Sequence, residues 1–194
     1  MVDAIGKRVT EGLRIVGIPT SERTAAQARK LNIPLSVLAE NPRIDLALDG
    51  ADEVELTTLN LIKGGGGNLL REKFVAIASA RFVIVVDERK LVEKLGTRSS
   101  LPVDIVQFGW QTTTQRLRDL LARPHLRTQA NGEPFVTDGG QYILDCAIGP
   151  ISSAPALATK LDSVVGVVEH GLFIGMASEV VVAGTGGVRV LRKA

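Results

Sequence analysis

The 194-residue sequence has little of what a disulfide, a metal cluster or a membrane helix requires. Its single cysteine, Cys146, cannot form an internal disulfide, and two histidines leave few nitrogen or sulfur ligands for a structural zinc site. No stretch reaches the roughly 18 uninterrupted apolar residues of a membrane helix, and the N-terminus lacks the apolar region of a secretory signal. We therefore expect a cytoplasmic protein that contacts no membrane and needs neither a metal nor another cofactor.

The sequence also has no large excess of positive or negative charge. The chain carries 23 Lys and Arg against 21 Asp and Glu, and the basic residues are scattered, which argues against nucleic-acid binding. Aromatic residues make up only 4% of a sequence that is 45% hydrophobic, so the core should be aliphatic. This composition favours an α/β protein.

Short aliphatic segments at 13–18, 44–49 and 82–86 predict strands of a Rossmann-like, mostly parallel sheet with helices on both faces. The segment 82–86 shows no alternation, as expected of a strand that is covered on both faces. After the first segment, Thr20 or Ser21 is a natural helix N-cap, and a further helix should begin near residue 69, with Leu70, Phe74 and Ile77 on one face.

The pattern changes after residue 100. Strands at 101–106, 135–137 and 142–146 and helices at 112–121 and 153–161 predict a smaller, ferredoxin-like α+β lobe. We place this lobe at 101–170, inserted in an α/β domain made of 1–100 and 171–194. The tail should return to the first sheet, with a hairpin at 184–187.

Acidic and basic residues gather around a run of glycines. The segment Asp49-Gly-Ala-Asp-Glu53 follows a predicted strand, and Lys63 precedes four glycines and a helix that carries Glu72. Amides of such a glycine run, with the helix N-terminus, could hold an oxyanion or enediolate. Glycines also permit tight turns, and a Glu in a first helical turn can simply complement the helix dipole. The combination nevertheless favours a site.

These motifs, together with Ile62-Lys-Gly-Gly-Gly, Arg71-Glu-Lys, Asp87-Glu-Arg-Lys90 and Gly17-Ile-Pro-Thr-Ser, resemble the type A ribose-5-phosphate isomerases over nearly the whole chain. The resemblance implies interconversion of D-ribose 5-phosphate and D-ribulose 5-phosphate through a cis-enediol, in the non-oxidative branch of the pentose phosphate pathway of carbohydrate metabolism. It also implies a metal-free enzyme that binds a small sugar phosphate and assembles as a homodimer.

The resemblance implies roles for individual residues. Glu72 would be the proton acceptor, Lys63 would stabilise the oxyanion, and Asp49 would assist ring opening. The substrate-binding set would be Asp49, Gly50, Ala51, Asp52, Lys63, Gly64, Gly65, Gly66 and Lys90. Without the family motif, Lys90 would be taken for a solvated lysine at a helix start.

Four other reactive side chains are assigned structural roles. Glu53 should cap a turn, and His125 and His170 lie far from any nucleophile or paired ligand. Cys146 should be a buried hydrophobe.

One family feature has no match. Members usually carry an upstream strand and a Gly-x-Gly-Ser-Thr loop that holds the substrate phosphate, and the similar string Gly184-Thr-Gly-Gly187 fits a hairpin better. We therefore expect an exposed sheet edge, and turnover by this truncated chain is left open. A related amino-sugar phosphate deaminase, a coenzyme A transferase and a sugar-phosphate-binding fragment without turnover stay as alternatives.

Overall fold

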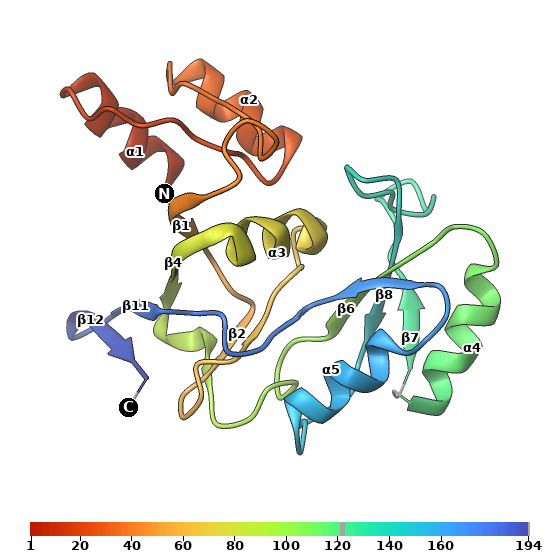
Figure 1. Cartoon of the computed structure of the whole chain (residues 1–194). Coiled ribbons are helices and arrows are strands. Elements are labelled where there is room, and N and C mark those ends of the chain that lie inside the picture. Colours follow the sequence, from red (N-terminus) through yellow and green to blue (C-terminus); the bar gives the residue numbers. More distant parts are fainter. Residues whose placement is uncertain (121–122, 194) are drawn as a thin grey trace.

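The computed structural model describes residues 1–120 and 123–193, which form three four-stranded sheets and five α-helices (Figure 1). The helices are α1 (Val2–Thr10), α2 (Glu22–Lys30), α3 (Leu69–Ala78), α4 (Trp110–Leu120) and α5 (Ala154–Asp162), with a short 3-10 helix η1 (Glu88–Lys90). The strands are β1 (Ile44–Asp49), β2 (Glu53–Glu55), β3 (Leu61–Ile62), β4 (Ser79–Asp87), β5 (Leu91–Val92), β6 (Leu101–Ile105), β7 (Pro124–Leu126), β8 (Tyr142–Cys146), β9 (Val167–His170), β10 (Leu172–Phe173), β11 (Glu179–Gly184) and β12 (Gly187–Arg192). No helix in the described part of the chain has the length and apolar character needed to span a bilayer.

The first sheet has the order β1-β4-β11-β12. The pairs β1–β4 and β4–β11 are parallel, whereas β12 runs antiparallel to β11 after the turn at 184–187. The expected return of the tail to this sheet and the expected hairpin are therefore confirmed. The carboxyl ends of β1 and β4 lie at the same edge of the sheet, which is where ligands bind in open α/β sheets.

The two faces of this sheet are covered unequally. Ile84 and Val180 are fully buried in an aliphatic cluster with the ring of Phe173. By contrast, Leu46, Leu48 and Val85 are 38–45% exposed. The prediction that the segment 82–86 is covered on both faces is thus wrong at Val85.

The segment 13–18 is not a strand, which corrects the prediction. Its only ladder contact among the described residues is a single bridge between Gly17 and Leu35. A strand requires a neighbouring backbone to pair with, and a groove of about 900 Å³ separates this segment from the free edge of β1. The expected exposed sheet edge is present at β1.

The second sheet, of order β10-β3-β2-β5, consists of strands of two or three residues that the pattern analysis did not predict. Glu53 opens β2 and is fully buried. Its carboxylate accepts hydrogen bonds from the backbone N–H groups of Gly96 (2.6 Å), Arg98 (2.6 Å) and Ser99 (2.5 Å). These bonds fix the 96–99 loop and fit the structural role assigned to Glu53.

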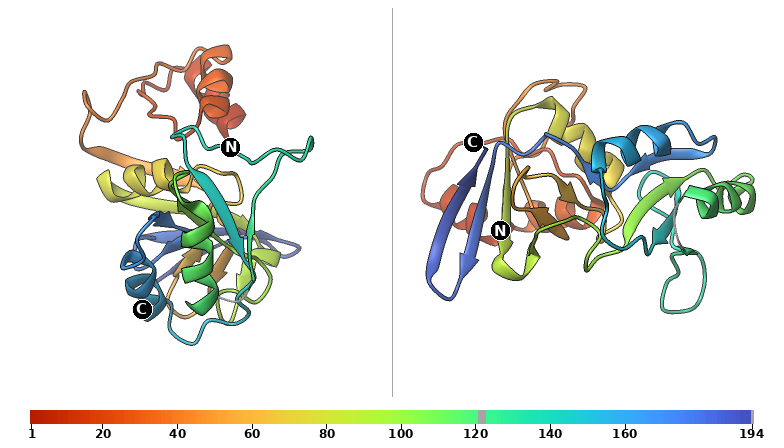
Figure 2. Two further views of the ribbon diagram at one scale, coloured as in Figure 1. Left: turned by 90° about the vertical axis from the view of Figure 1, so that its right-hand side faces the viewer. Right: turned by 90° about the horizontal axis from the view of Figure 1, so that it is seen from below.

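The third sheet, of order β7-β8-β6-β9, draws all its strands from 101–170 and packs with α4 and α5 on the side of the molecule away from β12 (Figures 1 and 2). The strand predicted at 135–137 is reduced to a single antiparallel bridge, between Val136 and Tyr142 at the start of β8, and the longer ladders of β8 are with β7 and β6. Of the predicted helix 112–121, residue Leu121 lies outside the described residues. The exact boundary of the lobe stays a prediction.

Helix α3 contacts β1 and β4 of the first sheet and β6 and β9 of the lobe. Its buried residues are Leu69, Lys73 and Ala76. Phe74 and Ile77, on the face that the sequence marked as apolar, are 58% and 69% exposed. Of the buried residues, Lys73 ties the helix that carries Glu72 to the lobe, through Glu169 and the carbonyl of His170.

Candidate active site

A cavity of about 190 Å³ opens where β1 ends and the glycine run leads into α3. It is lined by Asp49, Gly50, Ala51, Asp52, Lys63, Gly64, Gly65, Gly66 and Glu72. Every residue of the expected site except Lys90 is in this set. Lys90 lies in η1, just after β4, and is not among the residues that line the cavity.

Lys63 is at the centre of the site and its side chain is only 3% exposed. Its ammonium lies 2.8 Å from Asp49 Oδ2 and 3.2 Å from Glu72 Oε2, and it donates a 2.7 Å hydrogen bond to the carbonyl of Gly50. The ring of Phe173 lies 5.4 Å from the same ammonium. One cation thus holds two carboxylates in one cavity.

Lys63 and Glu72 form an ion pair, and Glu72 Oε2 is buried and has no hydrogen-bond partner among the described residues. Burial raises the pKa of Glu72, the Lys63 charge lowers it, and the Asp49 charge raises it, with a net rise. Burial lowers the pKa of Lys63, but Asp49 and Glu72 outweigh that effect and the net pKa is raised. A carboxylate with a raised pKa beside a lysine that stays charged is suited to general base catalysis.

Backbone amides from the glycine run and from the segment after β1 each bond an acid of the site. The Gly65 N–H donates a 2.8 Å hydrogen bond to Asp52 Oδ2, and the Gly50 N–H donates one of 2.8 Å to Asp49 Oδ1. Gly64 adopts φ +103°, where a Cβ would also lie 2.8 Å from the Leu69 side chain. A residue other than glycine is therefore excluded at position 64.

The large groove beside β1 reaches the same site. Asp49 and Glu72 line both the groove and the smaller cavity, while Leu13, Ile15 and Leu46 line the groove farther away. A ligand in the small cavity can therefore extend toward the edge of β1.

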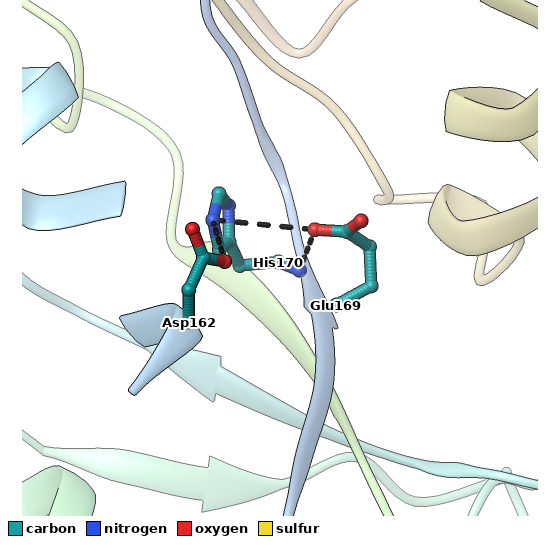
Figure 3. Close-up of side chains that lie close together, drawn as sticks. All are labelled: Asp162, Glu169 and His170. Atoms are coloured by element: carbon teal, nitrogen blue, oxygen red, sulfur yellow. Dashed lines mark hydrogen bonds and ion pairs between the residues drawn. The ribbon is translucent and has the colours of Figure 1, made fainter. Parts of the chain in front are cut away.

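One group of potential metal ligands lies elsewhere, in the lobe. Asp162, Glu169 and His170 point toward one another, with their ligand atoms within 4.8 Å (Figure 3). However, the Lys73 ammonium lies 2.6 Å from Glu169 Oε1, and His170 Nδ1 accepts a hydrogen bond from the Leu172 N–H. The Lys73 ammonium beside Glu169 would repel a metal ion and one nitrogen of His170 is already engaged, so this donor set fits a metal poorly.

Of the other residues assigned structural roles, His170 and Cys146 are buried, whereas His125 is exposed. His170 is 3% exposed with Nε2 3.2 Å from Asp162, and burial lowers its pKa. Cys146 is fully buried, and burial raises its pKa to about 12, so the thiol is unreactive. Ser21 caps α2 by accepting a hydrogen bond from the Thr24 N–H.

Sequence reasoning missed three residues next to the site: Lys73, Arg127 and Phe173. Lys73 belongs to the Arg71-Glu-Lys motif, but its position in the sequence does not show that its side chain is buried. Arg127 and Phe173 come from distant segments: Arg127 follows β7 of the lobe, and Phe173 lies in β10, which pairs with β3.

Fold and site together are those of an enzyme: a buried carboxylate, a fixed cation and glycine-run backbone lie at the carboxyl edge of a mostly parallel sheet, an arrangement suited to acid–base chemistry. Comparison with known proteins narrows this class. Residues 16–187 match the family model described as ribose 5-phosphate isomerase A (phosphoriboisomerase A). The chain belongs to this family.

Individual relatives are similar over nearly the whole chain. The ribose-5-phosphate isomerase A of Synechococcus sp. (strain JA-3-3Ab) is 54% identical over 193 residues, which are 99% of this chain and 84% of the relative. The structure of ribose 5-phosphate isomerase A from Methanocaldococcus jannaschii has a TM-score of 0.94 at 37% identity, covering 99% of this chain and 85% of that one. A D-ribose-5-phosphate isomerase in complex with phospho-erythronic acid has a TM-score of 0.95 at 33% identity, with the same coverage.

Proposed function

We propose that this chain interconverts D-ribose 5-phosphate and D-ribulose 5-phosphate with Glu72 as the base that moves the proton. The observation that carries the proposal is the Glu72 carboxylate, buried in the cavity and 3.2 Å from a lysine that also binds Asp49. Membership of the isomerase family supports the reaction, and the site geometry supports the roles.

In this mechanism, Asp49 assists opening of the sugar ring, and Glu72 then removes the proton from C2 of the open-chain aldose. The electron pair of the broken C–H bond forms the C1–C2 double bond, and the carbonyl electrons move to O1. Lys63 and the amides of the glycine run stabilise this developing negative charge. Glu72 returns the proton to C1, the hydroxyl proton on O2 passes to O1, and C2 becomes the ketone.

The remaining substrate contacts are also proposals. Gly50, Ala51 and Asp52, which line the cavity, would contact sugar hydroxyls, and Lys90 at the same sheet edge would reach the substrate. By analogy with the family, we also propose a cytoplasmic homodimer. Light scattering after gel filtration would test the dimer.

The direct test is Glu72→Gln, which keeps the shape of the side chain but removes the base. We expect kcat for ribose 5-phosphate to fall by roughly 10²- to 10⁴-fold, the usual contribution of a general base. Binding of phospho-erythronic acid, measured by calorimetry, should persist. The matched control is Glu93→Gln at an exposed position, which should leave kcat unchanged.

A fully active Glu72→Gln would refute the assigned base. An unmodified chain that binds the acid but shows no turnover would instead favour a binding fragment, and turnover of glucosamine 6-phosphate would favour the deaminase alternative.

A further inference from the structure

Arg127 belongs to the lobe and is firmly anchored there. It follows β7, and its backbone N–H donates a 2.8 Å hydrogen bond to the carbonyl of Ile143. Its guanidinium forms two bonds with the Asp145 carboxylate, 2.8 Å from Nε and 2.5 Å from Nη2, and lies 5.8 Å from the centre of the Phe135 ring. The side chain is 16% exposed. Such a two-pronged pair fixes the direction of the guanidinium.

The remaining nitrogen of this guanidinium, Nη1, contacts the glycine run. Arg127 Nη1 donates hydrogen bonds to the carbonyls of Gly64 (3.0 Å) and Gly65 (3.2 Å). These glycines are about 60 residues away in sequence and line the active-site cavity. The arginine therefore bridges the lobe and the site.

The carbonyl contacts also determine where the amides point. In a planar trans peptide the C=O and the following N–H are directed to opposite sides. With its Gly64 carbonyl held by Arg127, the first peptide presents the Gly65 N–H to Asp52, 2.8 Å away. The second peptide presents the Gly66 N–H away from Arg127, and this N–H has no partner within 1–120 and 123–193.

The end of the run is held from the same side. Gly67 has φ +85°, and a Cβ there would lie 2.6 Å from the Phe135 ring. Phe135 is itself tied to Arg127, whose carbonyl accepts a 2.8 Å hydrogen bond from the Phe135 N–H. Arg127 and Phe135 thus form one surface of the lobe against which the glycine run lies.

We propose that Arg127 is a positioning residue of the isomerase: it fixes two peptide planes of the glycine run so that the Gly66 N–H is presented to a substrate oxygen. The reaction it serves is the proposed function above. Arg127 does not touch the reacting atoms, and it links the integrity of the α+β lobe to the efficiency of the site.

Arg127→Lys tests this role because a lysine keeps the charge beside Asp145 but cannot span a carboxylate and two carbonyls. Displacing a donor by about an ångström can cost as much as ~10²-fold in rate, so we expect kcat to fall by roughly 10- to 100-fold with a KM changed by less than about threefold. Asp145→Asn should give a smaller fall, because Arg127 keeps its carbonyl contacts.

A second readout does not depend on turnover. Amide hydrogen exchange should speed up at Gly65 by roughly tenfold in Arg127→Lys, with protection elsewhere in the core unchanged. The control is Arg118→Lys, on the exposed side of α4, which should change neither kcat nor exchange.

Two results would overturn the proposal: kcat and Gly65 exchange equal to those of the control, or faster exchange throughout the chain together with a matching loss of thermal stability, which would indicate a purely structural role. The outcome is separable from the proposed base. A fully active Glu72→Gln alongside locally faster Gly65 exchange in Arg127→Lys would refute the base and leave the loop contact standing.

Discussion

Two buried lysines lie beside the same aromatic ring, and their pKa values are shifted in opposite directions. Lys63 lies 5.4 Å and Lys73 4.9 Å from the centre of the Phe173 ring. The pKa of Lys63 is raised, because two carboxylates outweigh its burial, whereas burial lowers the pKa of Lys73 and the single close carboxylate of Glu169 does not fully compensate.

The two lysines also differ in their surroundings: Lys63 lines the cavity, whereas Lys73 lies in the contact between α3 and the lobe. Lys63 contacts Asp49 and Glu72 and lines a cavity, where we propose that its charge stabilises a substrate oxygen. Lys73 is bound by Glu169 and by the His170 carbonyl in the contact between α3 and the lobe. One lysine–carboxylate contact thus lines the cavity at Glu72, whereas the next residue of α3, Lys73, packs the helix against the lobe.

The largest expected effect is that of Lys63→Met. Loss of the cation should lower kcat/KM by roughly 10²- to 10³-fold, as for loss of one transition-state donor. It should also raise the pKa of Glu72 further, because the Lys63 charge holds that pKa down. Steady-state kinetics would check this, with Lys94→Met at an exposed position as the control. Unchanged kinetics would contradict the proposal that Lys63, unlike Lys73, acts in catalysis.

Lys73→Met should show the reverse pattern, with a loss of stability and a small change in kcat. Removing one partner of a buried pair leaves Glu169 unpaired and typically costs about 3–5 kcal/mol. Urea unfolding would measure this loss, and Lys73→Met combined with Glu169→Leu should recover part of it. A fall in kcat as large as that of Lys63→Met, in a protein of unchanged stability, would place Lys73 in the catalytic machinery.

The pH dependence of kcat/KM tests whether Glu72, the carboxylate beside Lys63, is the titrating base. The base acts only when deprotonated, so activity should fall as the pH drops through its pKa. Because burial raises that pKa, the acid limb should lie above the value of roughly 4.3 for a free glutamate. An acid limb at or below the free value would show that Glu72 is not the titrating base.

The smallest effect is expected at Asp104, a buried carboxylate of β6 on the lobe side of α3. Burial raises its pKa to about 7, Arg127 and Lys73 lower it, and Glu169 and Glu72 raise it. Its Oδ1 has no hydrogen-bond partner among the described residues.

The folded-state pKa of Asp104 exceeds the unfolded value of roughly 3.9, so its contribution to stability is full below that value and is lost as the pH rises through about 7. Asp104→Asn should therefore raise the melting temperature progressively between pH 5 and pH 8, while Asp119→Asn on the exposed side of α4 should not. Equal melting curves for Asp104→Asn and the parent protein at pH 8 would contradict this reading.

The sequence predicted the site better than its surroundings. Asp49, Lys63 and Glu72 could be placed together because strand ends and a glycine run before a helix are local signals. The exposure of Phe74 and the β7–β8 pairing were not predicted, because both depend on which distant surface each segment meets.

Long-range partners had no local signal at all. Arg127 reaches Gly64 across 63 positions, and the buried state of Lys73 depends on Glu169, 96 positions away. The strand expected at 13–18 failed for a related reason, since a strand forms only where a neighbour supplies its hydrogen bonds.

Proton transfer by Glu72 is the central claim, and solvent exchange tests it most directly. Ribose 5-phosphate is incubated in D2O with the parent protein or with Glu72→Gln, and deuterium at C1 and C2 is followed by NMR. We predict incorporation with the parent protein and none with Glu72→Gln. Incorporation at the parental rate with Glu72→Gln would show that another group carries the proton.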